Sequence, residues 1–336
     1  MLQLVWSWQP ALYLFLGGMG AGAFIVAAVL YLLDQGRHAG IICASMWASV
    51  LCLGVGLLLL LSELITPARG LLMWQSFGNF TSWMTYGAWG AFLAIIVFGV
   101  SALLAVGKVS VGLANAWASH ASKKSVSAAA ARASFAAKTV AVRKVLCAIG
   151  ILLGAFVAVY TGMLLMTAPG VPLWNTPLLP CLFTASAFDT GVALVEIVAV
   201  VASRKEKLAH RARLLLEALV VVLVVLECFV LGVFLAVMVG GDLGSAVGAT
   251  AAESAELLVS GGLAPYFWGM VVVCGLAVPL LMATAGIVLR KKKDVNAFMA
   301  IGAIGALVGG CELRFLILAA GLHADVVAET VMGMIM

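Results

Sequence analysis

Eight separate stretches of this sequence are each long and apolar enough to cross a lipid bilayer as a helix. A crossing takes about 20 apolar residues, because the hydrocarbon layer is about 30 Å thick and a helix rises about 1.5 Å per residue. The stretches cover 9–33, 40–65, 83–106, 144–167, 181–202, 214–239, 265–289 and 295–320. Helices satisfy every backbone hydrogen bond internally, as lipid requires. We therefore predict an all-α polytopic membrane protein, with residues 1–336 forming one integral membrane domain.

The overall composition excludes several other classes of protein. Hydrophobic residues make up 65% of the chain and charged residues only 10%, whereas soluble domains carry about 25% charged residues. A water-soluble enzyme, a disordered protein and a nucleic-acid binder are therefore excluded as descriptions of the whole chain. The net charge of +5 does not indicate nucleic acid, because the basic residues gather in the loops on one side of the predicted membrane.

The basic residues predict the orientation of the chain. Alternate loops hold 17 of the 19 lysines and arginines, at residue 37 and within 107–144, 204–213 and 290–293. Cytoplasmic loops carry such an excess, so these loops are expected in the cytoplasm and both termini outside. The two remaining cations are Arg69, in an opposite loop, and Arg314, inside the last stretch. Five acidic residues are expected on the outer side, in agreement: Asp242, Glu253, Glu256, Asp325 and Glu329.

Two shorter segments bear on this topology. Residues 1–9 contain no positively charged region, so no cleavable signal peptide is predicted. The basic loop 107–143 is rich in alanine and serine, with scattered lysine and arginine. It fits either a surface helix on the cytoplasmic leaflet or a loosely ordered linker, and the sequence leaves both alternatives open.

The histidines and cysteines argue against a metal or haem centre in this protein. All four histidines lie in loops or at the ends of the apolar stretches, whereas a b-type haem in a membrane needs axial histidines projecting from the helices. The seven cysteines lie in or beside the apolar stretches and form no C-x-x-C pair. We interpret them as small packing residues and predict no haem, iron–sulfur cluster or metal site here.

Polar residues inside the apolar stretches are the candidate functional groups, because an ionisable side chain in lipid is costly. Most fall in the predicted outer half: Gln9, Tyr13, Glu63, Tyr160, Asp189, Glu312 and Arg314. Three more extend toward the cytoplasm: Glu196, Glu217 and Glu227.

These polar residues allow two interpretations. They can be structural ion pairs and caps, with Arg314 neutralised by Glu312 or Asp189. Alternatively, they form a quinone pocket on the outer side and a proton path leading inward. Tyrosine and glutamine suit a quinone carbonyl or hydroxyl, because they donate or accept hydrogen bonds in an apolar cleft. Carboxyl groups suit proton uptake and release.

Five segments, in order, resemble the NrfD-like membrane subunits of polysulfide reductase. The first is LYLFLGGMGAGAF (12–24), similar to the first helix of that family, and the second is SFGNFTSWMTYGAWGAF (76–92). The most similar is YTGMLLMTAPGVPLWNTPLLPCLFTASAFDTG (160–191). FWGMVVVCGLAVPLL (267–281) and LVGGCELRFLILAAG (307–321) resemble the last two helices. Together the segments extend over nearly the whole chain.

The resemblance implies an architecture and a role. It implies two four-helix bundles, a quinone such as menaquinone bound near the outer face, and no prosthetic group within the membrane. It also implies two partners on the outer face, a four-cluster ferredoxin-like iron–sulfur subunit and a molybdopterin catalytic subunit. The cell membrane of a prokaryote is the implied location.

The resemblance also assigns roles to individual residues. Tyr160, in the Tyr-Thr-Gly motif, is the implied quinone contact, and Gln9 and Tyr13 lie where the family places polar quinone ligands. The acidic element after the second helix, Asp-Leu-Gly-Arg-Pro in the family, corresponds to 63–67, with Glu63 as the acid. Its arginine is replaced here, and Arg69 lies nearby in the sequence. Asp189 stands where the family more often has a small hydroxyl residue.

The leading hypothesis is therefore the quinone-linked membrane subunit of a respiratory oxidoreductase, whose terminal catalytic site lies on a partner protein. In it Asp189, Glu196, Glu227, Glu312 and Arg314 are candidates for proton transfer. A secondary transporter that uses the buried carboxyl groups is the alternative, and it predicts inverted repeats and helices broken near the middle of the membrane. A purely structural anchor is the third possibility, and it predicts no bound quinone.

Overall fold

The computed structural model describes residues 8–34, 37–63, 83–122, 128–168, 170–204, 206–241, 245–289 and 295–324. Within these ranges the protein is helical, with eight helices long and apolar enough to cross a membrane. They are α1 (Trp8–Asp34), α2 (Ala39–Glu63), α4 (Trp83–Ala105), α6 (Ala128–Met166), α7 (Leu178–Ala202), α8 (His210–Val239), a continuous run of α10 (Ala264–Tyr266), η2 (Phe267–Ala277) and α11 (Val278–Val288), and α12 (Val295–Ala319). The predicted all-α, multi-pass class is confirmed.

The prolines explain where several of these helices begin. Pro10, Pro180 and Pro265 lie in the first turns of α1, α7 and α10, where the missing backbone N–H would have no partner within the helix. Pro279 is different, because it lies inside a continuous helix, directly after the π-helical stretch η2. The backbone stays helical through this irregularity, so this helix is not interrupted in the way a transporter's broken helices are.

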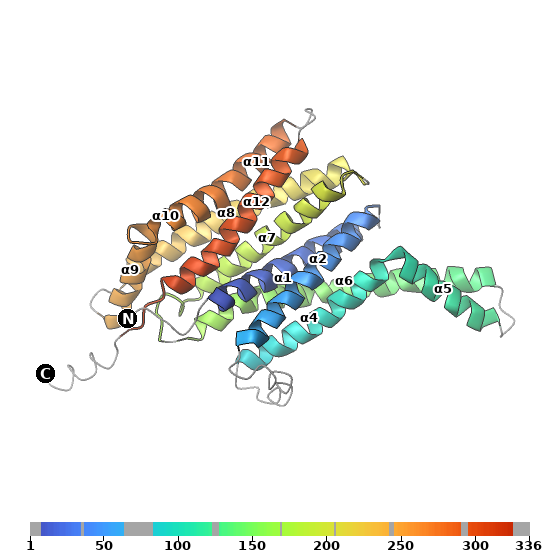
Figure 1. The fold of residues 1–336 in the computed structure, drawn as a ribbon, viewed down its shortest axis with the longest axis horizontal. Helices are drawn as coiled ribbons and strands as arrows, with labels where there is room; N and C mark the ends of the chain where they lie inside the picture. Colours follow the sequence, from blue (N-terminus) through green and yellow to red (C-terminus); the bar gives the residue numbers. More distant parts are fainter. Residues whose placement is uncertain are drawn as a thin grey trace.

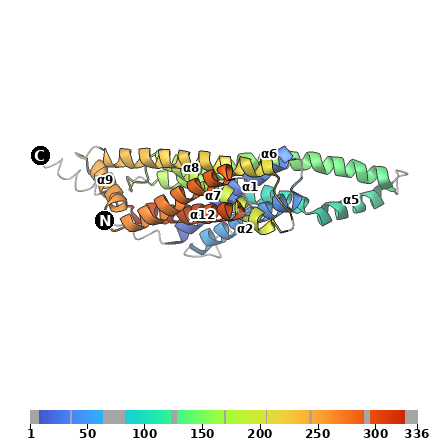
Figure 2. The same cartoon turned by 90° about the horizontal axis from the view of Figure 1, so that it is seen from above.

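The helices pack as two sets that meet along α1 and α7. In one set α1 contacts α2 and α6, and α4 contacts α2 and α6. In the other, α7 and α11 each contact both α8 and α12. Helix α7 also contacts α6 of the first set. Figures 1 and 2 show the long helices running side by side. Among the described residues, Arg37 and the basic residues of 206–213 lie at the end where α1 ends and α2 begins, here named the basic end. We name the other end of the bundle the opposite end. Which of the two ends faces the cytoplasm stays a prediction.

A glycine seam brings α1 and α7 into direct backbone contact. The α-carbon of Gly22 faces the carbonyl of Ala187 and the α-carbon of Gly191 so closely that a β-carbon on either glycine would overlap the other helix. Small residues allow this approach where lipid supplies no hydrophobic drive for association. The seam makes α1 the shared wall between the two sets of helices.

Two helices lie outside the main set of spans. Helix α5 (Gly107–Ser122) packs on the first part of α6 and on the end of α4. It fills much of the segment 107–143, which is helical at 107–122 and from 128 onward. Helix α9 (Ala246–Val259) lies at the opposite end, where Ser245 caps it by accepting a hydrogen bond from the Gly248 N–H at 3.1 Å. Residues 64–82, which include Arg69 and part of the 76–92 motif, lie outside the described residues.

Candidate functional site

Three of the predicted quinone-site residues lie near one another toward the opposite end of the molecule. Tyr13 comes from the second turn of α1, Glu63 is the last residue of α2, and Tyr160 lies in the last two turns of α6. Tyr13 interacts electrostatically with both Glu63 and Tyr160. All three side chains are half-buried. We name Tyr13, Glu63 and Tyr160 the tyrosine cluster.

Gln9 is the fourth predicted quinone-site residue. It precedes Tyr13 by one helical turn, so it lies on the same face of α1 and nearer to the opposite end. Its side chain is half-buried. Gln9 therefore flanks the tyrosine cluster along α1.

A glycine surface on α4 supports the tyrosine of α6. The ring of Tyr160 rests directly on the α-carbon of Gly87, and the ring of Phe156, one turn earlier, rests on Gly90. The two rings are nearly parallel, with centroids 6.2 Å apart and an interplanar angle of 18°. A side chain at position 87 would overlap the Tyr160 ring. Gly87 therefore fixes the position of the Tyr160 hydroxyl within the cluster.

The side chains of the tyrosine cluster can exchange hydrogen bonds and a proton with a bound polar molecule. Each phenol can donate or accept a hydrogen bond, and the carboxyl group of Glu63 can accept a proton. The cluster therefore combines polar groups with an aromatic surface.

A second polar group lies inside the other set of helices. Asp189 and Glu196 of α7 and Glu217 and Glu227 of α8 are all nearly or fully buried, with exposures of 2 to 4%. Asp189 interacts with both Glu227 and Glu196, and Glu196 interacts in turn with Glu217. We name these four residues the acid chain. It extends from the basic end to the middle of the membrane-spanning region.

Ser186 connects the acid chain to the buried arginine of α12. The hydroxyl of Ser186 donates to the carboxyl group of Glu227, and Nη1 of Arg314 donates to Ser186 Oγ at 3.1 Å. Arg314 is fully buried and also donates to the carbonyl oxygens of Gly310 at 2.6 Å and Phe183 at 3.4 Å. Its guanidinium lies between the rings of Phe15 and Phe183, at 5.6 and 5.1 Å from their centroids.

The expected partners of Arg314 were wrong. The carboxylate that interacts with this guanidinium is Glu227, through Ser186, rather than Glu312 or Asp189. The reason is the direction of the side chain, since Arg314 projects from α12 into α7, where the Ser186 hydroxyl and the Phe183 carbonyl oxygen are already in place. One oxygen of Asp189, Oδ1, is buried without a hydrogen-bond partner among the described residues.

Glu312 lies apart from the acid chain. It is half-buried and shares the outward face of α12 with Ile304 and Val308, which are 55% and 36% exposed. The structure therefore brings four of the five proton-transfer candidates into one part of the molecule, Asp189, Glu196, Glu227 and Arg314, and leaves the fifth on the surface of α12.

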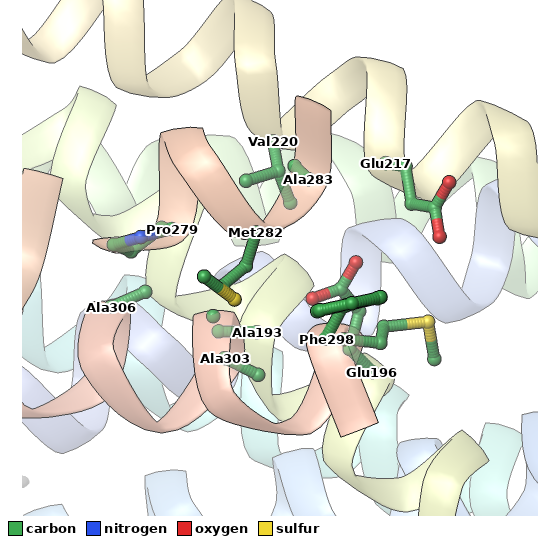
Figure 3. Close-up of a pocket in the computed structure, with 12 residues that line it drawn as sticks. Ala193, Glu196, Glu217, Val220, Pro279, Met282, Ala283, Phe298, Ala303 and Ala306 are labelled. Atoms are coloured by element: carbon green, nitrogen blue, oxygen red, sulfur yellow. The ribbon is translucent and has the colours of Figure 1, made fainter. Parts of the chain in front are cut away.

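At the basic end the acid chain ends in an ion pair and a small cavity. Arg213 Nε donates to Glu217 Oε1 at 3.1 Å, and the arginine side chain is 21% exposed. Glu196 and Glu217 line a cavity about the size of one water molecule, together with Val220, Met282, Phe298 and Ala303. Figure 3 shows both carboxyl groups among the side chains that line this cavity. The second oxygen of Glu217, Oε2, is buried with no hydrogen-bond partner within the described ranges.

The two polar groups occupy different faces of α1. Tyr13 faces α2 and α6, whereas Phe15 and Gly18 face α7 and α12 and contact Arg314. Residues two apart on a helix point about 200° apart, so α1 separates the tyrosine cluster from the acid chain.

Sequence reasoning missed three contributing residues, Gly87, Ser186 and Arg213. The spacing of Gly87 and Gly90 on α4 matches the aromatic pair on α6, and Ser186 lies one turn before Asp189. Arg213 lies four residues before Glu217, the spacing of a helical ion pair. Each of these spacings can be read from the sequence. None of them shows which other helix the residue contacts, because that depends on how the helices pack.

Comparison with known proteins is consistent with these features. The family described as "Polysulphide reductase, NrfD" matches residues 1–326. The C subunit of the polysulfide reductase of Wolinella succinogenes is 32% identical over 95% of this sequence and 94% of its own length. The protein NrfD homolog of Haemophilus influenzae is 27% identical, over 95% of this sequence and 94% of the relative. Protein NrfD of Escherichia coli is 28% identical, over 95% of each.

Proposed function

Because this protein belongs to the NrfD family of polysulphide-reductase membrane subunits, we propose that it exchanges electrons between a membrane quinone and an iron–sulfur partner outside the membrane. The coarser role follows from the family itself, a multi-pass membrane subunit of a redox complex. The quinone, its site and the partners are the proposal.

The convergence of Tyr13, Glu63 and Tyr160 from three helices carries the proposal for a quinone site. A quinone headgroup presents oxygens that accept or donate hydrogen bonds and a ring that packs on apolar surface. The two phenols supply the polar contacts, and Phe156 with Gly87 and Gly90 supplies flat apolar surface beside them. The residues present fit menaquinone or another quinone.

Each residue of the cluster has a separate task in this proposal. The Tyr160 and Tyr13 hydroxyls bind and orient the quinone oxygens. The Glu63 carboxylate accepts one of the two protons released as a quinol is oxidised to a quinone, and the other passes to water at the opposite end. Reduction of a quinone takes up two protons by the reverse transfers. The electrons pass to or from the external partner. Gln9 contributes a further hydrogen bond at the mouth of the site.

The partners belong at the opposite end of the molecule, next to the tyrosine cluster. Electron exchange needs the redox centre of the partner close to the quinone, and the cluster lies near that end. We place a four-cluster ferredoxin-like subunit there, which in turn carries a molybdopterin catalytic subunit. The positive-inside rule puts this end, and both termini, outside the cytoplasm of a prokaryotic cell.

The acid chain supports a second element of the proposal, a proton path. Four buried carboxyl groups follow one another from the Arg213–Glu217 ion pair to the Ser186–Arg314 contact. Charge in the membrane interior is costly, so such a series is expected where protons move. The path leads from the basic end to the middle of the bundle, and Asp189, Glu196 and Glu227 each hold the proton in turn.

Replacing Tyr160 with phenylalanine tests the quinone site. Y160F keeps the ring on Gly87 and removes the hydroxyl, so quinone-linked turnover of the assembled complex should fall about tenfold or more. Turnover with an artificial electron donor to the partner subunits should not change. Tyr266→Phe, an exposed tyrosine near the same end, is the matched control and should leave both activities unchanged. Normal quinol turnover in Y160F would remove Tyr160 from the site.

Replacing Glu227 with glutamine tests the proton path. E227Q keeps a hydrogen-bonding side chain beside Ser186 but cannot release a proton. We expect fewer protons moved per electron, measured with a pH-sensitive dye inside vesicles that contain the complex. Glu253→Gln, on the exposed face of α9, serves as the control. If E227Q keeps both the turnover and the proton stoichiometry, the path does not run through α8.

A further inference from the structure

We propose that the hairpin formed by α5 and the first part of α6 (107–122 and 128–143) binds anionic phospholipid headgroups with its basic side chains. This inference is independent of the quinone site. It rests on the length of α6, on the charge of the hairpin and on the side chains that it exposes.

The hairpin lies beyond what is needed to cross a membrane. Helix α6 has 39 residues, about 58 Å of helix, whereas the hydrocarbon layer is about 30 Å thick. Its first part pairs with α5 and extends past the other long helices at the basic end. Figure 1 shows the hairpin leaving the bundle to one side instead of continuing in the direction of α7 and α12. One side of the hairpin can therefore approach the lipid surface.

The charge of the hairpin is entirely positive. Residues 107–122 and 128–143 contain four lysines and arginines, Lys108, Arg132, Lys138 and Arg143, and no aspartate or glutamate. The basic residues near 204–213 differ, because Glu206 lies among them. Lys108, Arg132 and Lys138 are exposed on the hairpin. Since this segment contains no acid, its exposed cations have no counter-charge within it, and phospholipid headgroups at the adjoining leaflet can provide one.

The apolar side chains of the hairpin favour lipid over free anions. Val109, Leu113 and Trp117 follow one another at intervals of four residues on α5 and are 36%, 44% and 46% exposed. The ammonium of Lys138 lies 5.8 Å from the centroid of the Trp117 ring, and that ring is 6.1 Å from the ring of Phe135. An aromatic ring beside a lysine, on an apolar stripe, is the composition of a helix that lies in the headgroup layer. Free phosphate would satisfy the cations but would leave this stripe in water.

Hydrogen exchange of the full-length protein in lipid nanodiscs tests the proposal. Backbone exchange in 107–122 should be roughly tenfold slower in discs with phosphatidylglycerol than in discs of phosphatidylcholine alone, since basic residues near an anionic surface are attracted to it. The difference should disappear at high salt, when the Debye length falls to about 3 Å. Equal exchange in the two kinds of disc overturns the proposal.

Charge variants locate the effect. The triple variant K108Q/R132Q/K138Q should lose most of the difference, whereas R37Q/K207Q/R211Q should keep it. The second variant removes the same charge from exposed residues at the basic end outside the hairpin. Equal loss in both variants overturns the assignment to the hairpin, and so does protection that arises only in the assembled complex, which would assign the surface to a protein partner.

If the hairpin variant unfolds locally, its hydrogen exchange no longer reports lipid binding, and a second measurement then tests the proposal. Phosphatidylglycerol that stays bound to the purified protein is counted by mass spectrometry of the extracted lipid. The hairpin variant should retain less than the unaltered protein, and the control variant should retain the same amount. Equal retention by all three overturns the proposal even where exchange is fast.

Discussion

The tyrosine cluster and the acid chain lie on opposite sides of α1 and are built in different ways. The cluster is half-buried, comes from the ends of three helices and rests on the glycine surface of α4. The acid chain is almost completely buried and lies between α7, α8 and α12. An open site suits a molecule that enters and leaves, whereas a closed one suits protons, which pass through space the size of a water molecule.

The buried polar contacts around Arg314 and the tyrosine cluster are also expected to contribute differently to the stability of the protein. Arg314 donates hydrogen bonds to three acceptors on α7 and α12. Loss of the guanidinium leaves these buried acceptors unsatisfied. Tyr160 is held by contacts of its ring with Gly87 and Phe156, so loss of its hydroxyl changes chemistry more than folding. Substitution of Arg314 is therefore expected to unfold the protein more readily than substitutions in the cluster.

The largest effect is expected for Arg314→Leu. The variant removes the cation that interacts with Glu227 through Ser186 and should cost about 3–5 kcal/mol. Thermal unfolding of the purified protein in detergent should shift down by roughly 10 °C. Arg314→Lys is the control, because it keeps the charge and should recover part of the loss. An unchanged unfolding temperature in R314L would mean that the buried contacts of Arg314 are not needed for the packing of α12 on α7.

An intermediate effect is expected for Gly87→Ala. The new β-carbon would overlap the Tyr160 ring and displace its hydroxyl, so quinone-linked turnover should fall by about tenfold. Stability should fall by only about 1–3 kcal/mol. Gly99→Ala, on the same helix but with no atom within 4 Å, is the matched control and should leave turnover unchanged. Equal turnover in G87A and G99A would show that the exact position of Tyr160 does not matter.

The smallest effect is expected for Glu312→Gln. This residue lies on the outward face of α12, away from the acid chain. The unfolding free energy should change by less than about 1 kcal/mol, and the number of protons moved per electron should stay the same. A loss of proton movement as large as that in E227Q would place Glu312 in the path and would break the distinction between the outward face and the interior.

The sequence predicted the class of fold well, because an apolar run of this length leaves few alternatives. The eight long helices follow from hydropathy alone. The sequence also selected the polar residues that converge, since any ionisable group in such a run is exceptional. Hydropathy carries no information about which helices touch, so the Ser186 link, the support of Tyr160 by Gly87 and the outward position of Glu312 needed the packing of α1, α4, α7 and α12.

The error about Arg314 has the same physical origin. Glu312 and Asp189 lie at a similar depth to Arg314, and depth alone made them the suggested counter-charges, although residues 312 and 314 point to different faces of α12. The direction of a side chain depends on helix rotation, which the glycine contacts of α12 with α7 and η2 determine. Gly310 touches the methyl group of Thr190, and Gly309 touches Gly275. These contacts turn Arg314 toward Ser186 and leave Glu312 on the outside.

The packing of α1 against α7 has a consequence for biosynthesis. Helix α1 is made first, yet its glycine seam is covered only by α7, which begins about 140 residues later. At roughly 5–20 residues per second, the ribosome needs about 7–30 s to reach it. During that time α1 waits in lipid, which its uninterrupted apolar sequence permits. Arg314 arrives later still, on the last helix, so Glu227 and Ser186 must enter the membrane before their cation has been synthesised.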